Sequence, residues 1–231
     1  MITITPTNAA DLAEVPLFAQ LSGPQRDRLL EQHRVVSFPA DQVLVLEQDE
    51  SQGLILFRQG IAKVRQFNEE GEETVLSLLG PGELCGEMAM LHDGRRTADV
   101  VTLTACEALL LRSGPFRELL HSECLLSLAV ARLEVRRLRD LHRRFTLQGA
   151  DATTRLLAVL ADLARRTGLE SSPTSVIPPL PQRELAVLSG LARETTSRTL
   201  SKLRQRGIVV EAAGDGLRIA DPEALRRRGL L

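Results

Sequence analysis

The sequence predicts an α+β protein built in three successive parts: an antiparallel β-roll, a long helix, and a helical domain that ends in a short β-hairpin. Short apolar runs punctuated by glycines fill the first half, and a helical pattern follows Pro115. The charge divides as well: residues 1–150 hold 16 Lys and Arg against 21 Asp and Glu, whereas residues 151–231 hold 13 against 9. An acidic front and a basic back are typical of two domains with different partners.

The N-terminal part begins with a helix and continues as strands. Ser22 and Gln25 have the spacing of a capping box, which predicts a helix start. From Val35 to Leu111, β-rich runs such as QVLVLE, LILFRQG, IAKVRQF and TVLSLL lie between glycines. NEEGEE at 68–73 is typical of an exposed hairpin turn. We therefore expect residues 1–114 to form one jelly-roll-like domain.

Residues 115–148 carry a helical pattern with an apolar seam in alternating steps of four and three. The seam residues are Cys124, Leu128, Ala131, Val135, Leu138, His142 and Phe145. A heptad seam predicts a dimerisation helix that pairs with the same helix of a second copy. The alternative is a helix whose stripe packs on its own β-roll. Solvation is expected for the flanking arginines Arg132, Arg136, Arg137, Arg139, Arg143 and Arg144.

Residues 149–231 begin with a hinge. Gly149 is expected to end the long helix and Asp151 to cap an amphipathic helix that extends towards Gly168. A Pro- and Ser-rich loop at 169–181 follows.

Two further helices and a hairpin then predict a winged helix-turn-helix. The first helix starts at Gln182, a tight turn contains Gly190, and the second runs from about Arg193 to Arg206. Two strands around Gly214-Asp215-Gly216 form the wing.

The second of these helices carries side chains suited to reading DNA. The residues expected to contact it are Arg193, Glu194, Thr195, Ser197, Arg198, Ser201 and Lys202. An arginine fork fits guanine O6 and N7, a glutamate accepts from cytosine N4, and hydroxyl or ammonium groups hold phosphates. The alternative is an ordinary charged helix, which explains neither the turn nor the wing.

The segment CGEMAMLHDGRRTADV at 85–100 contains a second candidate site. Gly86-Glu87 opens a helical turn, and Arg95-Arg96-Thr97-Ala98 follows. A guanidinium and helix N-terminal amides together favour a buried phosphate, so the segment is a candidate anion cradle. The alternative is a charged surface bulge.

In this order of parts the chain resembles the cyclic-AMP receptor protein/FNR (CRP/FNR) family of bacterial transcription regulators. Residues 193–198, Arg-Glu-Thr-Thr-Ser-Arg, match the family's R-E-T-x-x-R recognition motif, and 86–87 with 96–98 match its phosphate-binding cassette. The resemblance covers nearly the whole chain. It implies a homodimer that binds a palindromic DNA site with TGTGA-like half-sites and is gated by a small ligand, with RNA polymerase as a partner. The loop at 169–181 is a candidate surface for that polymerase contact.

The resemblance also implies roles in the cassette. Arg96 would pair with a cyclic phosphate, and Thr97 would add a hydroxyl and a backbone N–H. Glu87 would accept from the ribose 2′-hydroxyl, Gly86 would permit close backbone approach, and Ala98 completes the motif. Polar residues of the long helix read the base in cyclic-AMP-responsive relatives, and Asp140 stands in that region here. The expected ligand is cyclic AMP; the alternative is a ligand-independent regulator with an empty or differently filled pocket.

Other classes find no support in the sequence. No apolar run has the length of a membrane span, and MITITPTNAADLAEVP lacks the regions of a signal peptide, so we expect a cytoplasmic protein without a membrane partner. Cys85, Cys106 and Cys124 form no CxxC pair, and each is expected to be a small buried apolar residue. No metal site is expected, nor a nucleophile beside a base, so an enzyme is not predicted.

Overall fold

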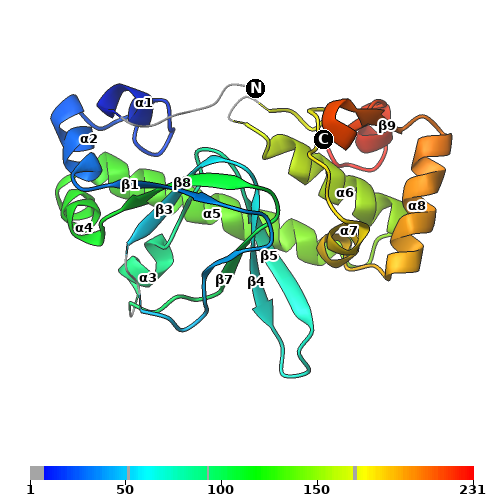
Figure 1. The fold of residues 1–231 in the computed structure, drawn as a ribbon, viewed down its shortest axis with the longest axis horizontal. Helices are drawn as coiled ribbons and strands as arrows, with labels where there is room; N and C mark the ends of the chain where they lie inside the picture. Colours follow the sequence, from blue (N-terminus) through cyan, green and yellow to red (C-terminus); the bar gives the residue numbers. More distant parts are fainter. Residues whose placement is uncertain (1–7, 51–52, 93, 169–170) are drawn as a thin grey trace.

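The computed structural model describes residues 8–50, 53–92, 94–168 and 171–231, and it confirms the α+β class (Figure 1). The N-terminal half contains two four-stranded sheets, ordered β1-β8-β3-β6 and β2-β7-β4-β5. All their pairings are antiparallel. The strands are β1 (Arg34–Phe38), β2 (Val43–Val45), β3 (Leu54–Gln59), β4 (Ala62–Phe67), β5 (Glu73–Leu79), β6 (Leu84–Cys85), β7 (Asp99–Thr102) and β8 (Cys106–Leu111).

Local signals define the turns and caps of this half. Ser22 and Gln25 form the capping box that starts α2 (Gly23–Leu30), with the Ser22 N–H donating to Gln25 Oε1 at 2.8 Å. Gly71 has φ +78° in the hairpin between β4 and β5, a conformation that glycine adopts without steric cost. Helices α1 (Ala9–Ala13), α2 and α4 (Ser113–Ser122) cover one end of the roll (Figure 1), and Phe116 of α4 is fully buried there.

The expected long helix is divided into two. Helix α4 ends at Ser122 and α5 (Cys124–Leu147) begins two residues later, because Glu123 has extended dihedrals (φ −114°, ψ 94°). One face of α5 packs on the roll through Leu126, Val130 and Leu133.

The predicted seam lies on the other face of α5 and is exposed throughout, so it does not pack on the β-roll of its own chain. Its large apolar members are Leu128 (43% exposed), Val135 (55%), Leu138 (52%) and Phe145 (74%). Cys124 is exposed as well, which corrects the expectation that all three cysteines are buried; Cys85 and Cys106 are.

The C-terminal half follows the predicted order. Asp151 caps α6 (Ala152–Arg165) by accepting from the backbone N–H groups of Thr153 and Thr154. Helix α7 (Gln182–Ser189), a turn at Gly190 and helix α8 (Arg193–Gln205) form the helix-turn-helix. Strands β9 (Val209–Ala212) and β10 (Gly216–Ile219) pair as the wing, and α9 (Glu223–Arg226) follows.

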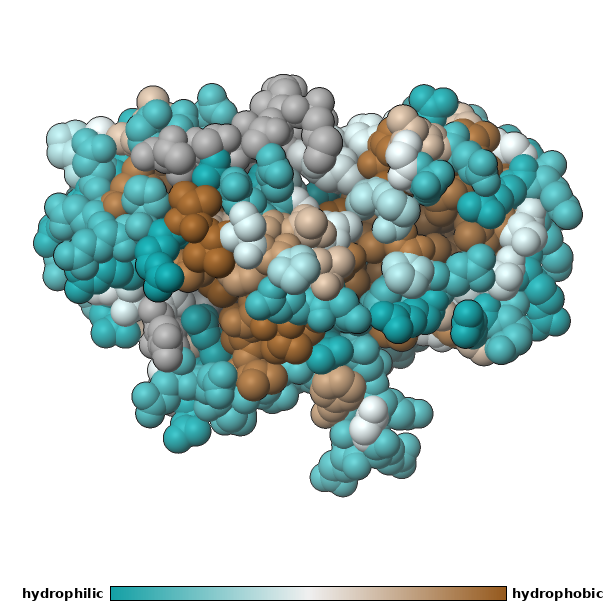
Figure 2. Space-filling model, viewed as in Figure 1, coloured by the Kyte–Doolittle hydropathy of each residue, from teal (hydrophilic) through white to brown (hydrophobic). Residues whose placement is uncertain are grey.

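The two halves share one hydrophobic core. Ile61, Leu78 and Leu103 of the roll belong to the same buried cluster as the interior residues of α6, α7 and α8. In the view of Figure 2, apolar side chains gather over the middle of the molecule, and polar side chains cover both ends. A buried charge accompanies this contact: Lys63 of β4 donates to Glu184 of α7 at 2.7 Å.

None of the helices in the described ranges combines the length and apolar character needed to cross a bilayer.

Candidate functional site

The cassette is built around Gly86, which connects β6 to the short helix α3 (Glu87–Leu91). Gly86 has φ +102°, and a Cβ built on it would lie 2.1 Å from Arg96 Nη1 and 2.6 Å from the carbonyl oxygen of Gly53. Only glycine fits here, both because of the positive φ and because a Cβ would lie too close to the backbone carbonyl of Gly53. The structure therefore brings Gly86 and Arg96 together.

Arg96 is held firmly beneath the surface. Its backbone N–H donates to the carbonyl of Asp49 at 2.8 Å, and its Nη2 donates to the carbonyl of Gly53 at 2.8 Å. The residue is only 8% exposed, whereas its neighbour Arg95 is exposed. Of the two adjacent arginines, Arg96 is thus the one placed to meet a buried anion.

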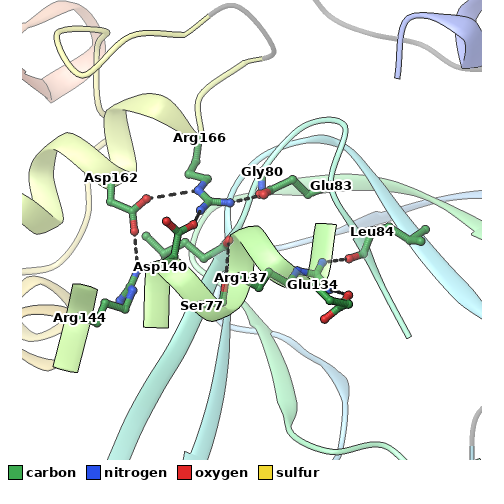
Figure 3. A network of polar contacts seen from close by, with 11 residues as sticks. Ser77, Gly80, Glu83, Leu84, Glu134, Arg137, Asp140, Arg144, Asp162 and Arg166 are labelled. Carbon is green, nitrogen blue, oxygen red and sulfur yellow. Dashed lines mark hydrogen bonds and ion pairs between the residues drawn. The ribbon is translucent and has the colours of Figure 1, made fainter. Parts of the chain in front are cut away.

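Glu87 is fixed from the opposite side by the long helix. One carboxylate oxygen of Glu87 accepts from Arg137 of α5, and Arg137 also donates to the carbonyl of Leu84 (Figure 3) and pairs with Glu134 at 3.1 Å. Burial disfavours the charged guanidinium, but the Glu87 and Glu134 charges outweigh this and raise the pKa of Arg137 above its ordinary value. The cassette is thereby connected directly to α5.

Arg137 was expected to be a solvated flank, and that expectation is wrong. It continues a second stripe, Leu126, Val130, Leu133 and Arg137, which faces the roll in steps of four, three and four. This helical spacing was the signal that marked Arg137 as inward-facing. Arg144 is also half-buried and pairs with Asp162; Arg132, Arg136, Arg139 and Arg143 are exposed as expected.

Two buried atoms of the cassette have no hydrogen-bond partner within the described part of the chain: Arg96 Nη1 and Glu87 Oε2. A buried polar group without a partner costs about 1–3 kcal/mol, and more when it is charged. One atom is a cationic donor and the other an anionic acceptor. They fit, respectively, a phosphate oxygen and a sugar hydroxyl.

The thiol of Cys85 lies in the field of these charges. Burial raises its pKa to about 12, and the Glu87 carboxylate adds to the rise, while the guanidinium groups of Arg96 and Arg137 oppose it. A glutamate and two arginines from three separate segments thus converge at the end of β6. The thiol itself stays protonated at neutral pH and acts as a small apolar side chain.

Burial and the adjacent Glu87 carboxylate raise the pKa of Glu134 from its ordinary 4.5 to about 7, against the opposing effect of Arg137. The folded protein therefore binds this proton more tightly than the unfolded chain does. The resulting stability is present below pH 4.5 and is lost as the pH rises through 7. We expect the free energy of unfolding in urea to fall between pH 5.5 and 8 relative to that of Glu134→Gln, which cannot ionise. Parallel pH profiles for the two proteins would contradict this assignment.

The remaining cassette residues, Thr97 and Ala98, lie between Arg96 and the start of β7 at Asp99. Thr97 is exposed, with its hydroxyl 3.9 Å from Met88 Sδ and its carbonyl accepting from Gln66 at 2.8 Å. Ala98 is buried. Thr97 is therefore open to a ligand, and Ala98 packs into the roll.

Asp140 lies one turn beyond Arg137 on α5 and points away to a different group (Figure 3). Its carboxylate is 3.5 Å from Arg166 Nη2, and Arg166 also pairs with Glu83 and with Asp162. The structure does not bring Asp140 into contact with the cassette residues of this chain. It places the carboxylate in an ion-pair cluster that joins the roll, α5 and α6.

The candidate DNA-reading side chains lie on the outer face of α8. Arg193, Glu194, Arg198, Ser201 and Lys202 are exposed, and Thr195 and Ser197 are half-buried. Thr196, Thr199, Leu200 and Leu203 form the buried face that docks α8 on the domain core. This buried face leaves the N-terminal turns of α8 facing solvent.

Across the described residues, no group of three or more His, Cys, Asp or Glu side chains is arranged to hold a metal ion.

Comparison with known proteins gives the same two parts. The cyclic nucleotide-binding domain family matches residues 35–123, and the Crp-like helix-turn-helix domain family matches residues 154–228. The Cyclic AMP receptor protein of Thermus thermophilus is 33% identical over 195 residues, which cover 84% of this chain and 88% of that protein. The CRP-like cAMP-activated global transcriptional regulator of Mycobacterium tuberculosis is 28% identical over 219 residues, covering 94% and 97%.

Among solved structures, FixK2 from Bradyrhizobium japonicum has the same fold. It matches with a TM-score of 0.71 at 16% identity, covering 84% of this chain and 96% of that one. This chain is a transcription regulator and not an enzyme, as are the family and the two relatives that it matches. The chain belongs to the CRP/FNR family of bacterial transcription regulators.

Proposed function

We propose that this regulator binds cyclic AMP in the cassette of the β-roll and, as a homodimer, binds a palindromic DNA site in response. The observation that carries the ligand part is the pair of buried atoms without partners, Arg96 Nη1 and Glu87 Oε2. Cyclic AMP supplies one singly charged phosphate and one 2′-hydroxyl, which match these two atoms in charge and in hydrogen-bonding sense. The Thermus thermophilus and Mycobacterium tuberculosis relatives, named respectively as a cyclic AMP receptor and as a cAMP-activated regulator, support this choice of nucleotide.

The chain's own residues suggest how binding reaches the long helix. Glu87 uses one carboxylate oxygen for Arg137, so the other can accept from a ligand hydroxyl without breaking the link to α5. A ligand on Arg96 and Glu87 would therefore favour one position of α5 relative to the roll. Thr97, exposed beside the cassette, would donate its hydroxyl to the phosphate.

We assign residues 1–114 to the sensor, 115–148 to dimerisation and 149–231 to DNA binding. Two-fold pairing of α5 would cover the exposed seam and bring the two α8 helices into successive major grooves, one helical turn apart. A DNA target places this activity in the bacterial cytoplasm. RNA polymerase is the partner expected from the family. The loop at 169–181 is a candidate contact, although Leu169 and Glu170 lie outside the described residues.

Leu138→Glu is expected to convert the dimer to a monomer. Leu138 is 52% exposed in the single chain, and pairing would bury two carboxylates against each other without a counter-charge. We expect the dimer dissociation constant, measured by sedimentation equilibrium, to rise by roughly a hundredfold or more. Arg136→Glu, which places the same side chain off the seam and changes the net charge even more, is the control. A Leu138→Glu protein that stays dimeric at micromolar concentration would contradict the seam.

Arg193→Ala is expected to relax sequence preference more than Lys202→Ala does. Arg193 stands at the exposed N-terminal end of α8, where a fork to a guanine is worth about 1–3 kcal/mol of discrimination. Lys202, about two and a half turns along α8, is suited to phosphate, so its loss should weaken binding to specific and to random DNA by similar factors. Fluorescence anisotropy with both DNAs separates the two effects. If both variants lost similar affinity for specific and for random DNA, the base-reading role of Arg193 would be rejected.

The second candidate is a CRP/FNR regulator whose DNA binding does not depend on a ligand. Asp140 favours it, because this residue of the base-reading region is directed to Arg166 and makes no contact with the cassette residues of this chain. In that case Arg96→Gln would leave DNA affinity unchanged.

A further inference from the structure

Arg155, in the first turn of α6, reaches backbone carbonyls from two other segments. Its Nε donates to the carbonyl of Ser189 at 2.9 Å, and its Nη2 donates to the carbonyl of Gly190. Its Nη1 lies 3.5 Å from the carbonyl of Gln148. One guanidinium therefore lies between the end of α5 and the turn of the helix-turn-helix.

The turn needs such a partner. Ser189 and Gly190 end α7, where carbonyl groups lack intrahelical partners and carry the negative end of the helix dipole. Gly190 has φ +59°, and a Cβ built on it would lie 2.4 Å from Arg155 Nη2. Only Leu191 and Ala192 separate this turn from α8, so its geometry determines the direction in which α8 starts.

Hydrogen bonds in the first turn of α6 hold the backbone of Arg155. Its N–H donates to the carbonyl of Asp151 at 3.0 Å, and the Asp151 side chain caps the same turn. Gln148, the third partner, is the C-terminal cap of α5. Gln148, Arg155 and the turn at 189–190 all line one cavity of about 690 Å³, so the end of α5, the start of α6 and the end of α7 meet around a single space.

We propose that Arg155 is a positioning residue that transmits the placement of the α5 end to the recognition helix α8. This role rests on the proposed function, because it presupposes that α8 reads DNA. Arginine is required because its planar fork offers several N–H donors in fixed directions, whereas a lysine ammonium cannot serve all three carbonyls in this geometry. The side chain does not belong to the expected DNA-contacting set, so it acts through the turn.

The test compares Arg155→Lys with Arg165→Lys in the full-length protein. Arg165 is on the same helix, borders the same cavity and donates to the carbonyl of Leu230 at 3.0 Å, in the C-terminal tail and not in the turn. Anisotropy measures affinity for the palindromic site and for random DNA of equal length, in the presence of cyclic AMP. Cyclic-AMP affinity and the unfolding midpoint are measured on the same preparations.

Arg155→Lys is expected to lose about tenfold in affinity for the palindrome, as for the loss of one charged hydrogen bond, and less than twofold for random DNA. Its cyclic-AMP affinity should match the wild type, and Arg165→Lys should stay within twofold throughout. If Arg155→Lys lost affinity equally for both DNAs, or lost affinity for neither, the positioning role alone would be overturned. A wild-type protein that does not prefer the palindrome would overturn the proposed function and this role together. Arg155→Ala is measured in the same way. If the alanine variant does not fold, the comparison of Arg155→Lys with Arg165→Lys alone tests the positioning role.

Discussion

Arg96→Gln is expected to lower the affinity for cyclic AMP on the order of a hundredfold to a thousandfold. Truncating one partner of a buried, hydrogen-bonded charge pair costs about 2–5 kcal/mol, and Arg96 is only 8% exposed. Glutamine retains an N–H donor for the carbonyl of Gly53, which Arg96 Nη2 contacts at 2.8 Å. The variant should therefore fold while losing the charge that meets the phosphate. Isothermal titration calorimetry gives the affinity, and thermal unfolding verifies the fold.

Arg95→Gln is the matched control. Arg95 is the adjacent residue, is exposed, and donates to the carbonyl of Gln48 at 3.2 Å. Its replacement should change the affinity less than threefold, as for a screened surface charge. The reverse pattern, in which Arg95→Gln abolishes binding and Arg96→Gln does not, would show that the two arginines exchange roles.

Lys63→Met is expected to destabilise the protein by about 3 kcal/mol, which is typical when one partner of a buried ion pair is removed. The Lys63 side chain is 4% exposed, and its Nζ lies 2.7 Å from carboxylate oxygens of both Glu73 and Glu184. Methionine preserves the volume but removes the cation shared by the two carboxylates, which keep only the longer contacts of Glu73 with Arg65 at 3.6 Å and of Glu184 with Arg183 at 3.7 Å. Because Glu184 belongs to α7, the loss should also loosen the helix-turn-helix from the roll. Urea unfolding gives the change in free energy.

The chain offers a matched control, since its only other lysine is Lys202, which is exposed on α8. Lys202→Met should leave stability within about 0.5 kcal/mol. In the double variant Lys63→Met Glu184→Met, apolar packing replaces the pair, and we expect recovery of at least half of the loss. A Lys63→Met protein as stable as the wild type would contradict the buried pair.

The sequence predicted best those features that depend on a few neighbouring residues. The capping box at Ser22, the cap at Asp151 and the wing around Gly214 each rest on contacts or dihedrals within about four positions. The start of α8 at Arg193 was likewise predicted from neighbouring residues. Such features can be predicted from the sequence because their physical causes lie within a few neighbouring residues.

Contacts between distant segments were not predictable in this way. Arg137 and Glu87 are 50 positions apart, and Lys63 and Glu184 are 121 apart. Helical spacing places Arg137 on the same stripe as Leu126, Val130 and Leu133, but only the position of the roll shows that this stripe is the buried one. The same reason accounts for Asp140, which the sequence associated with the ligand and the structure pairs with Arg166.

The division of the long helix at Glu123 has a different origin. Residues 115–148 have helical composition throughout, and the break depends on how α4 packs on the roll. The consequence is that Cys124, at the start of α5, is exposed at the beginning of the seam and not buried.

Ligand gating is tested by fluorescence anisotropy of a labelled palindromic DNA with TGTGA-like half-sites, titrated with the protein with and without cyclic AMP. The proposed function predicts that cyclic AMP tightens binding to this DNA at least tenfold, and that Arg96→Gln abolishes the effect. Tight, site-specific binding that is unchanged by cyclic AMP would contradict ligand gating and would favour the ligand-independent regulator.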